Sequence, residues 1–436
     1  MMRCSLRKNP PVRRKLFLPL AVFAVVALAA ACTSSGPIEG AAPRTQAAFD
    51  KQLVLKGARL AAVGNCITCH TAHDGRAYAG GYPVHTPFGT VYGTNITPEP
   101  DTGIGRWSEA EFVRAMREGL GRDGSHLYPA FPYEYFTRLD DADLHALYAF
   151  VMTREPVRNV PPPTRILVPR SAVALWKARY FKPERFHSDP SRPAAWNRGA
   201  YLVESLAHCS ACHTPRNKLG AEKKDEYFAG GEAGNWHAPA LDASSPSPVP
   251  WTAPVLTEYL RSGLVDDHAI TAGPMKPVVM NLSQAAEDDV RAIADYVVSI
   301  DARSAREREG KARAALAAPP AREPGSAADR PVRNGAALYA GACGDCHDRG
   351  RAAEGGALPL PLAIGLAIPT PRNLIHIVRG GIVPGPHDTL PWMPAFSDAL
   401  TDDELADLLV YLRSLTDKPP WPDVAAEVKR ASKGEG

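Results

Sequence analysis

The pattern Cys-x-x-Cys-His occurs three times in this chain and constrains its fold more than any other feature of the sequence. Two thiols about one helical turn apart can add to the two vinyl groups of one haem, and the following histidine can bind the iron. We therefore predict three covalently bound c-type haems. The copies are Cys66-Ile67-Thr68-Cys69-His70, Cys209-Ser210-Ala211-Cys212-His213 and Cys343-Gly344-Asp345-Cys346-His347, and their histidines are the expected iron ligands.

Two other kinds of site also use paired cysteines. A zinc site needs two such pairs close together, whereas these pairs are widely separated along the chain. A disulfide oxidoreductase needs a βαβ context around its pair, which is absent here. The haem interpretation is therefore preferred for all three motifs.

The bulk composition fits a globular protein with room for about three domains. The 436 residues are 45% hydrophobic and 22% charged, and 42 prolines and 35 glycines indicate long loops. A net charge of +3, without a basic stripe carrying interleaved aromatics, gives no support for nucleic-acid binding.

The N-terminus is typical of an exported bacterial protein. A positive region precedes the apolar run Leu16–Ala31, which ends in small residues before Cys32. We expect a signal peptide at 1–31 and a tether at 32–52. Lipidation of Cys32, simple cleavage and a retained anchor are the alternatives, and each places the chain on the periplasmic side of the bacterial inner membrane. No later segment is apolar enough to span a membrane.

The surroundings of the three motifs also repeat. Each motif follows a Gly-Ala pair, and each is followed by a helix that ends in Arg-x-Gly and then by a closing helix with one apolar face. We expect Ser108 and Thr252 as N-caps, Gly119 and Gly263 as C-caps, and a capping box of Thr401 with Glu404. The Gly-Ala pairs begin at Gly57, Gly199 and Gly335, and the closing helices carry Phe150, Tyr296 and Tyr411, which either fill the core or contact the N-terminal helix.

This organisation is similar to the class I cytochrome c fold, so we predict an all-α chain of three tandem class I cytochrome c domains. The first linker contains Trp176, Tyr180 and Phe181, which we expect to pack on a domain or a partner. The expected divisions are domain 1 at 53–152, a linker at 153–195, domain 2 at 196–302, a linker at 303–330, domain 3 at 331–418 and a C-terminal tail at 419–436.

A methionine opposite the histidine is the expected second axial ligand of an electron-carrying haem, and it raises the reduction potential. Met275 lies twelve residues after Gly263, and Met393 lies twelve residues after Gly381. This agreement predicts Met275 and Met393 as iron ligands. Met280 is the rival in the second copy, but its spacing does not match.

The first copy departs from this pattern, because the same count from Gly119 reaches Phe131, which cannot bind iron. The sixth ligand of the first haem is therefore His126, Met152 or Met116, or the position is open. Arg117, Arg261 and Arg379 share one repeat position. They either stabilise a helix C-terminus or pair with a haem propionate.

Over nearly all of the mature chain, these motifs resemble the membrane-associated triheme cytochrome c subunit of bacterial periplasmic dehydrogenases. The resemblance rests on three segments. It implies electron transfer from a partner dehydrogenase subunit to quinone, a downstream cytochrome or an oxidase of the respiratory chain. The segments are Gly89-Thr90-Val91-Tyr92-Gly93-Thr94-Asn95-Ile96-Thr97-Pro98, His126-Leu127-Tyr128-Pro129-Ala130 and Ala272-Gly273-Pro274-Met275.

The Pro-Ala-Phe-Pro-Tyr version around Phe131 is similar to subunits that accompany molybdopterin hydroxylases acting on aldehydes or N-heteroaromatics such as nicotinate. Members with methionine there serve quinoprotein alcohol dehydrogenases or flavin-dependent gluconate and sorbitol dehydrogenases, which are the alternative partners. We expect no catalytic residue in this chain. A haem enzyme, such as a peroxidase at an open first haem, is the rival of another class.

Overall fold

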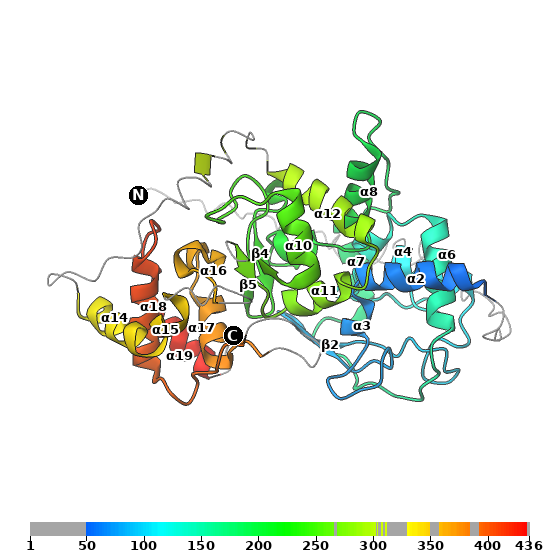
Figure 1. The fold of residues 1–436 in the computed structure, drawn as a ribbon. Coiled ribbons are helices and arrows are strands. Elements are labelled where there is room, and N and C mark those ends of the chain that lie inside the picture. The colour runs from blue at the N-terminus through cyan, green and yellow to red at the C-terminus, as the bar shows by residue number, and fades with distance from the viewer. Residues whose placement is uncertain are drawn as a thin grey trace, which may run out of the picture.

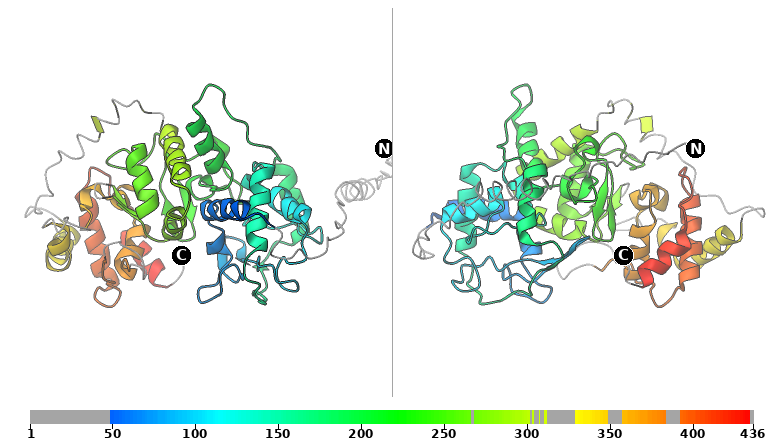
Figure 2. Two further views of the ribbon diagram at one scale, coloured as in Figure 1. Left: turned by 45° about the vertical axis from the view of Figure 1, so that its right-hand side comes forward. Right: turned by 180° about the vertical axis from the view of Figure 1, so that it is seen from behind.

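The computed structural model describes residues 49–265, 268–301, 303, 307, 310–311, 329–348, 357–383 and 392–433. The expected signal peptide, Cys32 and most of the tether lie outside these residues. Three groups of helices lie side by side in the order of the chain (Figures 1 and 2). Within the described residues, no helix combines the length and apolar character that crossing a membrane requires.

Each group is built on the packing of its first helix against its last long helix. We call the groups the first, second and third units. Their helix pairs are α2 (Lys51–Val63) with α6 (Asp141–Met152), α8 (Ala194–Glu204) with α12 (Glu287–Ile300), and α14 (Arg330–Ala342) with α18 (Asp402–Ser414).

A glycine allows the close approach of the two helices in every unit. A Cβ on Gly57 would lie 2.0 Å from the carbonyl oxygen of Ala146, and one on Gly199 would lie 1.9 Å from that of Ala292. Next to each contact lies the aromatic residue of the closing helix, such as Phe150 beside Gly57. These aromatics therefore contact the N-terminal helix as well as filling the core.

Along the chain, the helix that ends in Arg-x-Gly comes between the two members of each pair, as α4 (Glu109–Glu118), α10 (Ala253–Ser262) and α17 (Arg372–Gly380). Ser108 is the N-cap of α4, as expected, and also forms a capping box with Glu111. Thr401 forms the expected capping box with Glu404 at the start of α18. Gly119 and Gly263 are the expected left-handed C-caps. Thr252 occupies the N-cap of α10 without a side-chain hydrogen bond to the helix.

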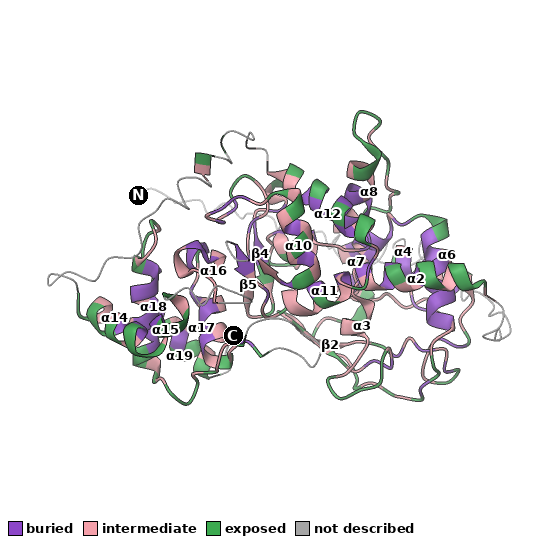
Figure 3. Ribbon diagram, in the orientation of Figure 1, coloured by how far each residue is buried: buried purple, intermediate pink, exposed green. Residues whose placement is uncertain are grey.

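Buried apolar side chains form two clusters. One is continuous through the first and second units, and the other lies in the third unit. In Figure 3 the closing helices α6 and α18 are mostly buried, whereas α2 and α14 expose their outer faces. The third-unit cluster extends beyond residue 418, where the expected tail begins, because Trp421 is buried and donates its indole N–H to the carbonyl of Ile368 at 2.8 Å.

Short antiparallel strands, which an all-α prediction does not anticipate, occur in the loops of the first and second units. They are β1 (Pro83–Thr86), β2 (Gly89–Tyr92) and β3 (Arg165–Ile166) in one sheet, β4 (Gly231–Ala233) with β5 (Trp236–Ala238), and β6 (Leu264–Val265) with β7 (Ala269–Ile270). The remaining helices are α3 (Cys66–Cys69), α5 (Tyr133–Phe136), α7 (Arg170–Tyr180), α9 (Ser210–His213), η2 (Lys224–Glu226), α11 (Met275–Leu282), α15 (Gly344–His347), η3 (Leu360–Leu362), α16 (Ile364–Ala367) and α19 (Val424–Ser432).

The segment expected to link the first and second units is folded onto both of them. Lys177 of α7 donates its ammonium to the carbonyl of Gly119 at 2.8 Å. Trp176 donates its indole N–H to the carbonyl of Leu219 in the second unit at 2.9 Å. The expectation that the aromatics of this segment pack on a domain is confirmed for Trp176.

Candidate haem sites

The three Cys-x-x-Cys-His motifs lie at short helical turns, α3, α9 and α15, which follow the N-terminal helix of each unit. In α3 a single turn carries both thiols of the first motif, Cys66 and Cys69. The residues just before the first two motifs, Asn65 and His208, have φ values of 53° and 40°, so the chain turns sharply into each motif. The six cysteines of the motifs form no disulfide with one another.

The first cysteine of each motif has the electrostatics of a buried thiol. Burial raises the pKa of the Cys66 and Cys209 thiols to about 12 and that of Cys343 to about 11. A disulfide oxidoreductase instead needs a thiol with a lowered pKa. Among the described residues, no three His, Cys, Asp or Glu side chains gather as a metal cluster. The redox-dithiol and zinc interpretations therefore gain no support.

Each motif histidine is held by a backbone carbonyl from a later loop. The Nδ1 atom of His70 lies 2.7 Å from the oxygen of Thr94, and that of His213 lies 2.7 Å from the oxygen of Pro239. In the third unit His347 makes the same contact with Leu358 at 3.1 Å. Because Nδ1–H donates in this contact, the lone pair of Nε2 remains available for iron.

A single cavity of about 2370 Å³ borders the second and third motifs and reaches the edge of the first, and its lining is predominantly apolar. It is lined in the second unit by His213 and in the third by His347, and it reaches Cys69 at the edge of the first motif. An apolar cavity beside paired thiols and an imidazole is the environment that a c-type haem requires.

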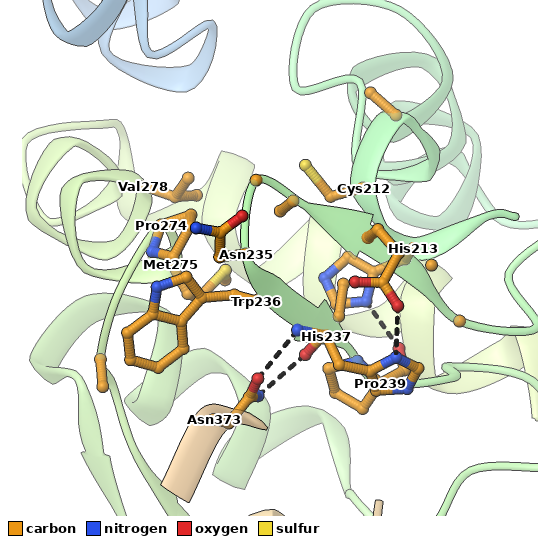
Figure 4. Close-up of a pocket in the computed structure, with 18 of the residues that line it drawn as sticks. Cys212, His213, Asn235, Trp236, His237, Pro239, Pro274, Met275, Val278 and Asn373 are labelled. Atoms are coloured by element: carbon orange, nitrogen blue, oxygen red, sulfur yellow. Dashed lines mark hydrogen bonds and ion pairs between the residues drawn. The ribbon is translucent and has the colours of Figure 1, made fainter. Parts of the chain in front are cut away.

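The two methionines predicted as ligands line this cavity. Met275 is the first residue of α11, and Figure 4 shows it and His213 reaching the pocket from separate segments of the second unit. Met393 lines the cavity together with His347, and its backbone pairs with Ile382 through two hydrogen bonds of 2.9 Å. Met280 is 53% exposed.

Phe131, at the position of these methionines in the first unit, packs on Phe136 with ring centroids 5.5 Å apart and planes inclined by 69°. Met116 and Met152 are buried in the same apolar cluster, on α4 and α6. His126 follows α4 on a turn, and its Nδ1 atom is buried.

The three equivalent arginines differ in their partners. Arg117 donates to the carbonyl of Leu139 at 2.8 Å and pairs with Asp141 at 2.5 Å, and Arg379 pairs with Asp402. The Nη1 atom of Arg261 is buried, with no hydrogen-bond partner in the described part of the chain. A buried guanidinium nitrogen facing no acceptor fits a propionate of a bound haem, because such groups are otherwise hydrogen-bonded.

The chain matches known protein families in two regions and known dehydrogenase subunits over most of its length. Residues 54–155 match the cytochrome c family, and residues 330–412 match cytochrome c oxidase cbb3-type subunit III. The chain is 33% identical to the fructose dehydrogenase cytochrome subunit of Gluconobacter japonicus, over 92% of this chain and 86% of that protein. The chain belongs to the family of cytochrome c subunits of dehydrogenases. Its cytochrome c domains imply covalently bound haem c.

Two further relatives are also dehydrogenase subunits. The cytochrome subunit is 35% identical to the gluconate 2-dehydrogenase cytochrome c subunit of Pantoea cypripedii, over 83% of this chain and 85% of that one. It is 42% identical to a nicotinate dehydrogenase subunit of Pseudomonas putida over 94% of its own length. It spans only 34% of that relative.

In this cytochrome subunit the first and second motifs face each other across the boundary of their units. The pKa of the Cys69 thiol is raised by burial and by the nearby Cys212 thiol of the second motif. Asn281, on the helix that begins at Met275, donates to Asn65 at 2.5 Å and to Thr68 at 3.2 Å. The helix carrying the second unit's methionine therefore also positions the attachment loop of the first motif.

A second connection joins the second and third units through β5. The amide side chain of Asn373 accepts from the backbone N–H of His237 at 2.8 Å and donates to its carbonyl at 2.9 Å (Figure 4). The same segment continues to Pro239, whose carbonyl holds His213. Asn373 also lines the cavity. One short segment therefore contacts both a proximal histidine and the third unit.

The sequence did not indicate these connecting residues. Asn281 and Asn373 belong to none of the repeated patterns, because each makes a contact specific to one boundary between units. The attachment and ligand candidates were found because they recur at fixed spacings.

Proposed function

We propose that this chain is a triheme c-type cytochrome that accepts electrons from a partner dehydrogenase and delivers them to the respiratory chain. The observation that carries the proposal is the equivalence of the three motifs. Each places two thiols at a helical turn and a histidine held through Nδ1, and one cavity borders the second and third motifs and reaches Cys69 of the first. Haem c bound at each motif supplies a one-electron couple.

The chain's own residues provide binding, orientation and exclusion of water. The thiols fix the position of the cofactor, and carbonyl contacts such as that of Pro239 with His213 orient the imidazole. Met275 and Met393 provide thioethers on the cavity wall, which favour the reduced iron. No residue of this chain is proposed to act on an organic substrate.

The haem count tests this proposal directly. The intact chain, produced in a host that matures c-type cytochromes, should carry three haems per polypeptide by mass spectrometry and by pyridine haemochrome absorbance. Replacing both cysteines of one motif with alanine should reduce the count by one, whichever motif is chosen. A count of two in the unaltered chain would contradict the proposal, and the alanine series would identify the motif that is not loaded.

For the partner, we propose a molybdopterin hydroxylase that acts on aldehydes or N-heteroaromatics. The extent of similarity to the nicotinate dehydrogenase subunit of Pseudomonas putida supports this choice. A quinoprotein alcohol dehydrogenase or a flavin-dependent gluconate or sorbitol dehydrogenase is the alternative. Affinity purification of the tagged chain from its native host, with metal and flavin analysis of the captured protein, separates them. Molybdenum is expected, and captured flavin or pyrroloquinoline quinone would favour the alternative.

For the location, we propose the periplasmic side of the inner membrane, with quinone, a cytochrome or an oxidase as acceptor. The sequence of residues 1–32 supports export and a lipid anchor at Cys32. Membrane fractions labelled with radioactive palmitate should contain the labelled chain, and the Cys32→Ser variant should be unlabelled. Radioactive label in that variant would contradict a lipid anchor at Cys32. The acceptor is tested separately, by adding a quinone analogue to membranes with reduced haem and measuring haem oxidation.

A further inference from the structure

The turn that follows α4 in the first unit has the same backbone pairing as the one that follows α10 in the second. Leu120 forms an antiparallel bridge with His126, as Leu264 does with Ile270. Leu127 donates its N–H to Gly119 at 2.8 Å, and Thr271 does so to Gly263 at 2.7 Å. His126 thus occupies the structural position of Ile270.

That position faces a haem site in the second unit. Ile270 lines the cavity that His213 and Met275 also line. By the equivalence of the two turns, His126 takes in the first unit the position that lines the haem site in the second unit. An imidazole therefore replaces an apolar side chain in the unit that lacks the distal methionine.

The imidazole of His126 has an unsatisfied nitrogen. Its Nδ1 atom is buried and has no hydrogen-bond partner among the residues that the structure describes. Leaving a buried polar atom without a partner is unfavourable, because the atom loses its hydrogen bonds to water and gains none in return.

The other candidate ligands in the first unit have no buried polar atom that lacks a partner. Phe131 is packed on Phe136 and offers no donor atom. Met152 and Met116 are 4% and 7% exposed within the apolar cluster, where a thioether needs no polar partner. Met116 occupies the position of Leu260, which also lines the second unit's cavity, so Met116 is the competitor that an experiment has to separate from His126.

We propose that His126 is the sixth ligand of the iron bound at the first motif, opposite His70. This inference rests on the proposed function, because it assumes a haem at Cys66 and Cys69. Methionine raises the potential of haem iron relative to a second histidine. The first haem is therefore the low-potential member of the set, while Met275 and Met393 make the other two the higher-potential members.

The test begins with the haem count, which concerns the proposed function alone. Ferric samples that contain three haems are then studied by low-temperature electron paramagnetic resonance and near-infrared magnetic circular dichroism, which distinguish His/His from His/Met ligation. The unaltered chain should show one His/His haem and two His/Met haems. Three haems without a His/His species would overturn the ligand assignment while leaving the triheme proposal in place.

Variants then identify the histidine. His126→Ala should lose the His/His signal and bind carbon monoxide at one reduced haem, whereas Met116→Leu and the exposed control His73→Ala should keep the signal. His126→Ala combined with Phe131→Met should regain six-coordinate iron with a thioether ligand. Persistence of the His/His signal in His126→Ala, or its loss in Met116→Leu alone, would contradict the proposal. If His126→Ala does not fold, the spectra of the unaltered chain still decide the ligand type.

Discussion

Trp236 of β5 stacks on His376 of α17, with ring centroids 5.0 Å apart and ring planes inclined by 25°. Its indole also fills the space beside Gly273, where a Cβ would lie 2.4 Å from the ring. Gly273 has a φ of +54° and precedes Met275 by two residues. One aromatic ring therefore supports the loop that presents the second unit's methionine and also joins that unit to the third.

Replacing Trp236 with leucine should weaken both connections. We expect a loss of about 1–3 kcal/mol in the free energy of unfolding, because a large, partly buried ring is removed and the site is not refilled. Guanidinium denaturation of the haem-loaded chain, followed by far-UV circular dichroism and by the Soret band, measures the loss. Trp236→Phe keeps a ring on His376 and should lose much less. Equal losses in both variants would show that the stack is not the important contact.

The glycines at the helix crossings give a second prediction, with a control on the same helix. A Cβ on Gly335 would lie 2.2 Å from the carbonyl oxygen of Asp407, whereas one on Gly341 would meet no atom within 4 Å. Gly335→Ala should therefore destabilise the third unit by about 1–3 kcal/mol or more through overpacking. Gly341→Ala should stabilise α14 by about 0.5–1 kcal/mol, because alanine is the better helix former. The melting temperatures of the two variants distinguish these outcomes. Similar changes in melting temperature for both would show that Gly335 is not at a close contact between α14 and α18.

Glu134 makes the stability of the folded chain depend on pH, in a direction that its pKa defines. Burial raises the pKa of its carboxyl from 4.5 to about 7, and its Oε2 atom has no hydrogen-bond partner in the described part of the chain. A carboxyl whose pKa is raised on folding contributes stability that is fully present below pH 4.5 and is lost as the pH rises through about 7. Glu134→Gln should remove this loss.

The measurement is the denaturation midpoint of the haem-loaded chain below pH 4.5 and above pH 7. Glu134→Gln should be more stable than the unaltered chain on the alkaline side, and the difference between the two should shrink toward the acid side. Asp225→Asn changes an exposed carboxyl nearby and serves as the control. A pH profile of Glu134→Gln that parallels that of the unaltered chain would show that another group determines the dependence.

The sequence predicted the helix ends, which follow local patterns, and missed the elements whose positions depend on contacts between distant segments. Gly119 and Gly263 end equivalent helices, and Thr401 with Glu404 matches the capping-box pattern, so local rules for helix ends identified them. The loop strands β1 and β2 and the helix α7 were not predicted, because their positions depend on contacts between distant segments. Lys177 illustrates this, since its ammonium is held by carbonyl groups at the end of α4.

The residues of the candidate haem sites also fall into those that the sequence predicted and those that it did not. The cysteines, the histidines and the cavity positions of Met275 and Met393 followed from spacing alone, because a covalent cofactor fixes where its ligands must be. The same spacing predicted no ligand where it reached Phe131. The position of His126 became informative only when the paired turns after α4 and α10 could be superposed in the structure.

The two cavity methionines give the last prediction, and α11 provides its control. Met275 lines the cavity at the start of this helix, whereas Met280 is 53% exposed on the same helix. In the ferric chain, Met275→Ala and Met393→Ala should each remove about half of the weak far-red charge-transfer band that marks methionine sulfur on haem iron, because each removes one of two thioether ligands. Each should also lower the reduction potential of one haem in a spectroelectrochemical titration. Met280→Ala should leave the band and all potentials unchanged. An unchanged band in both cavity variants, or its loss in Met280→Ala, would show that other residues bind these irons.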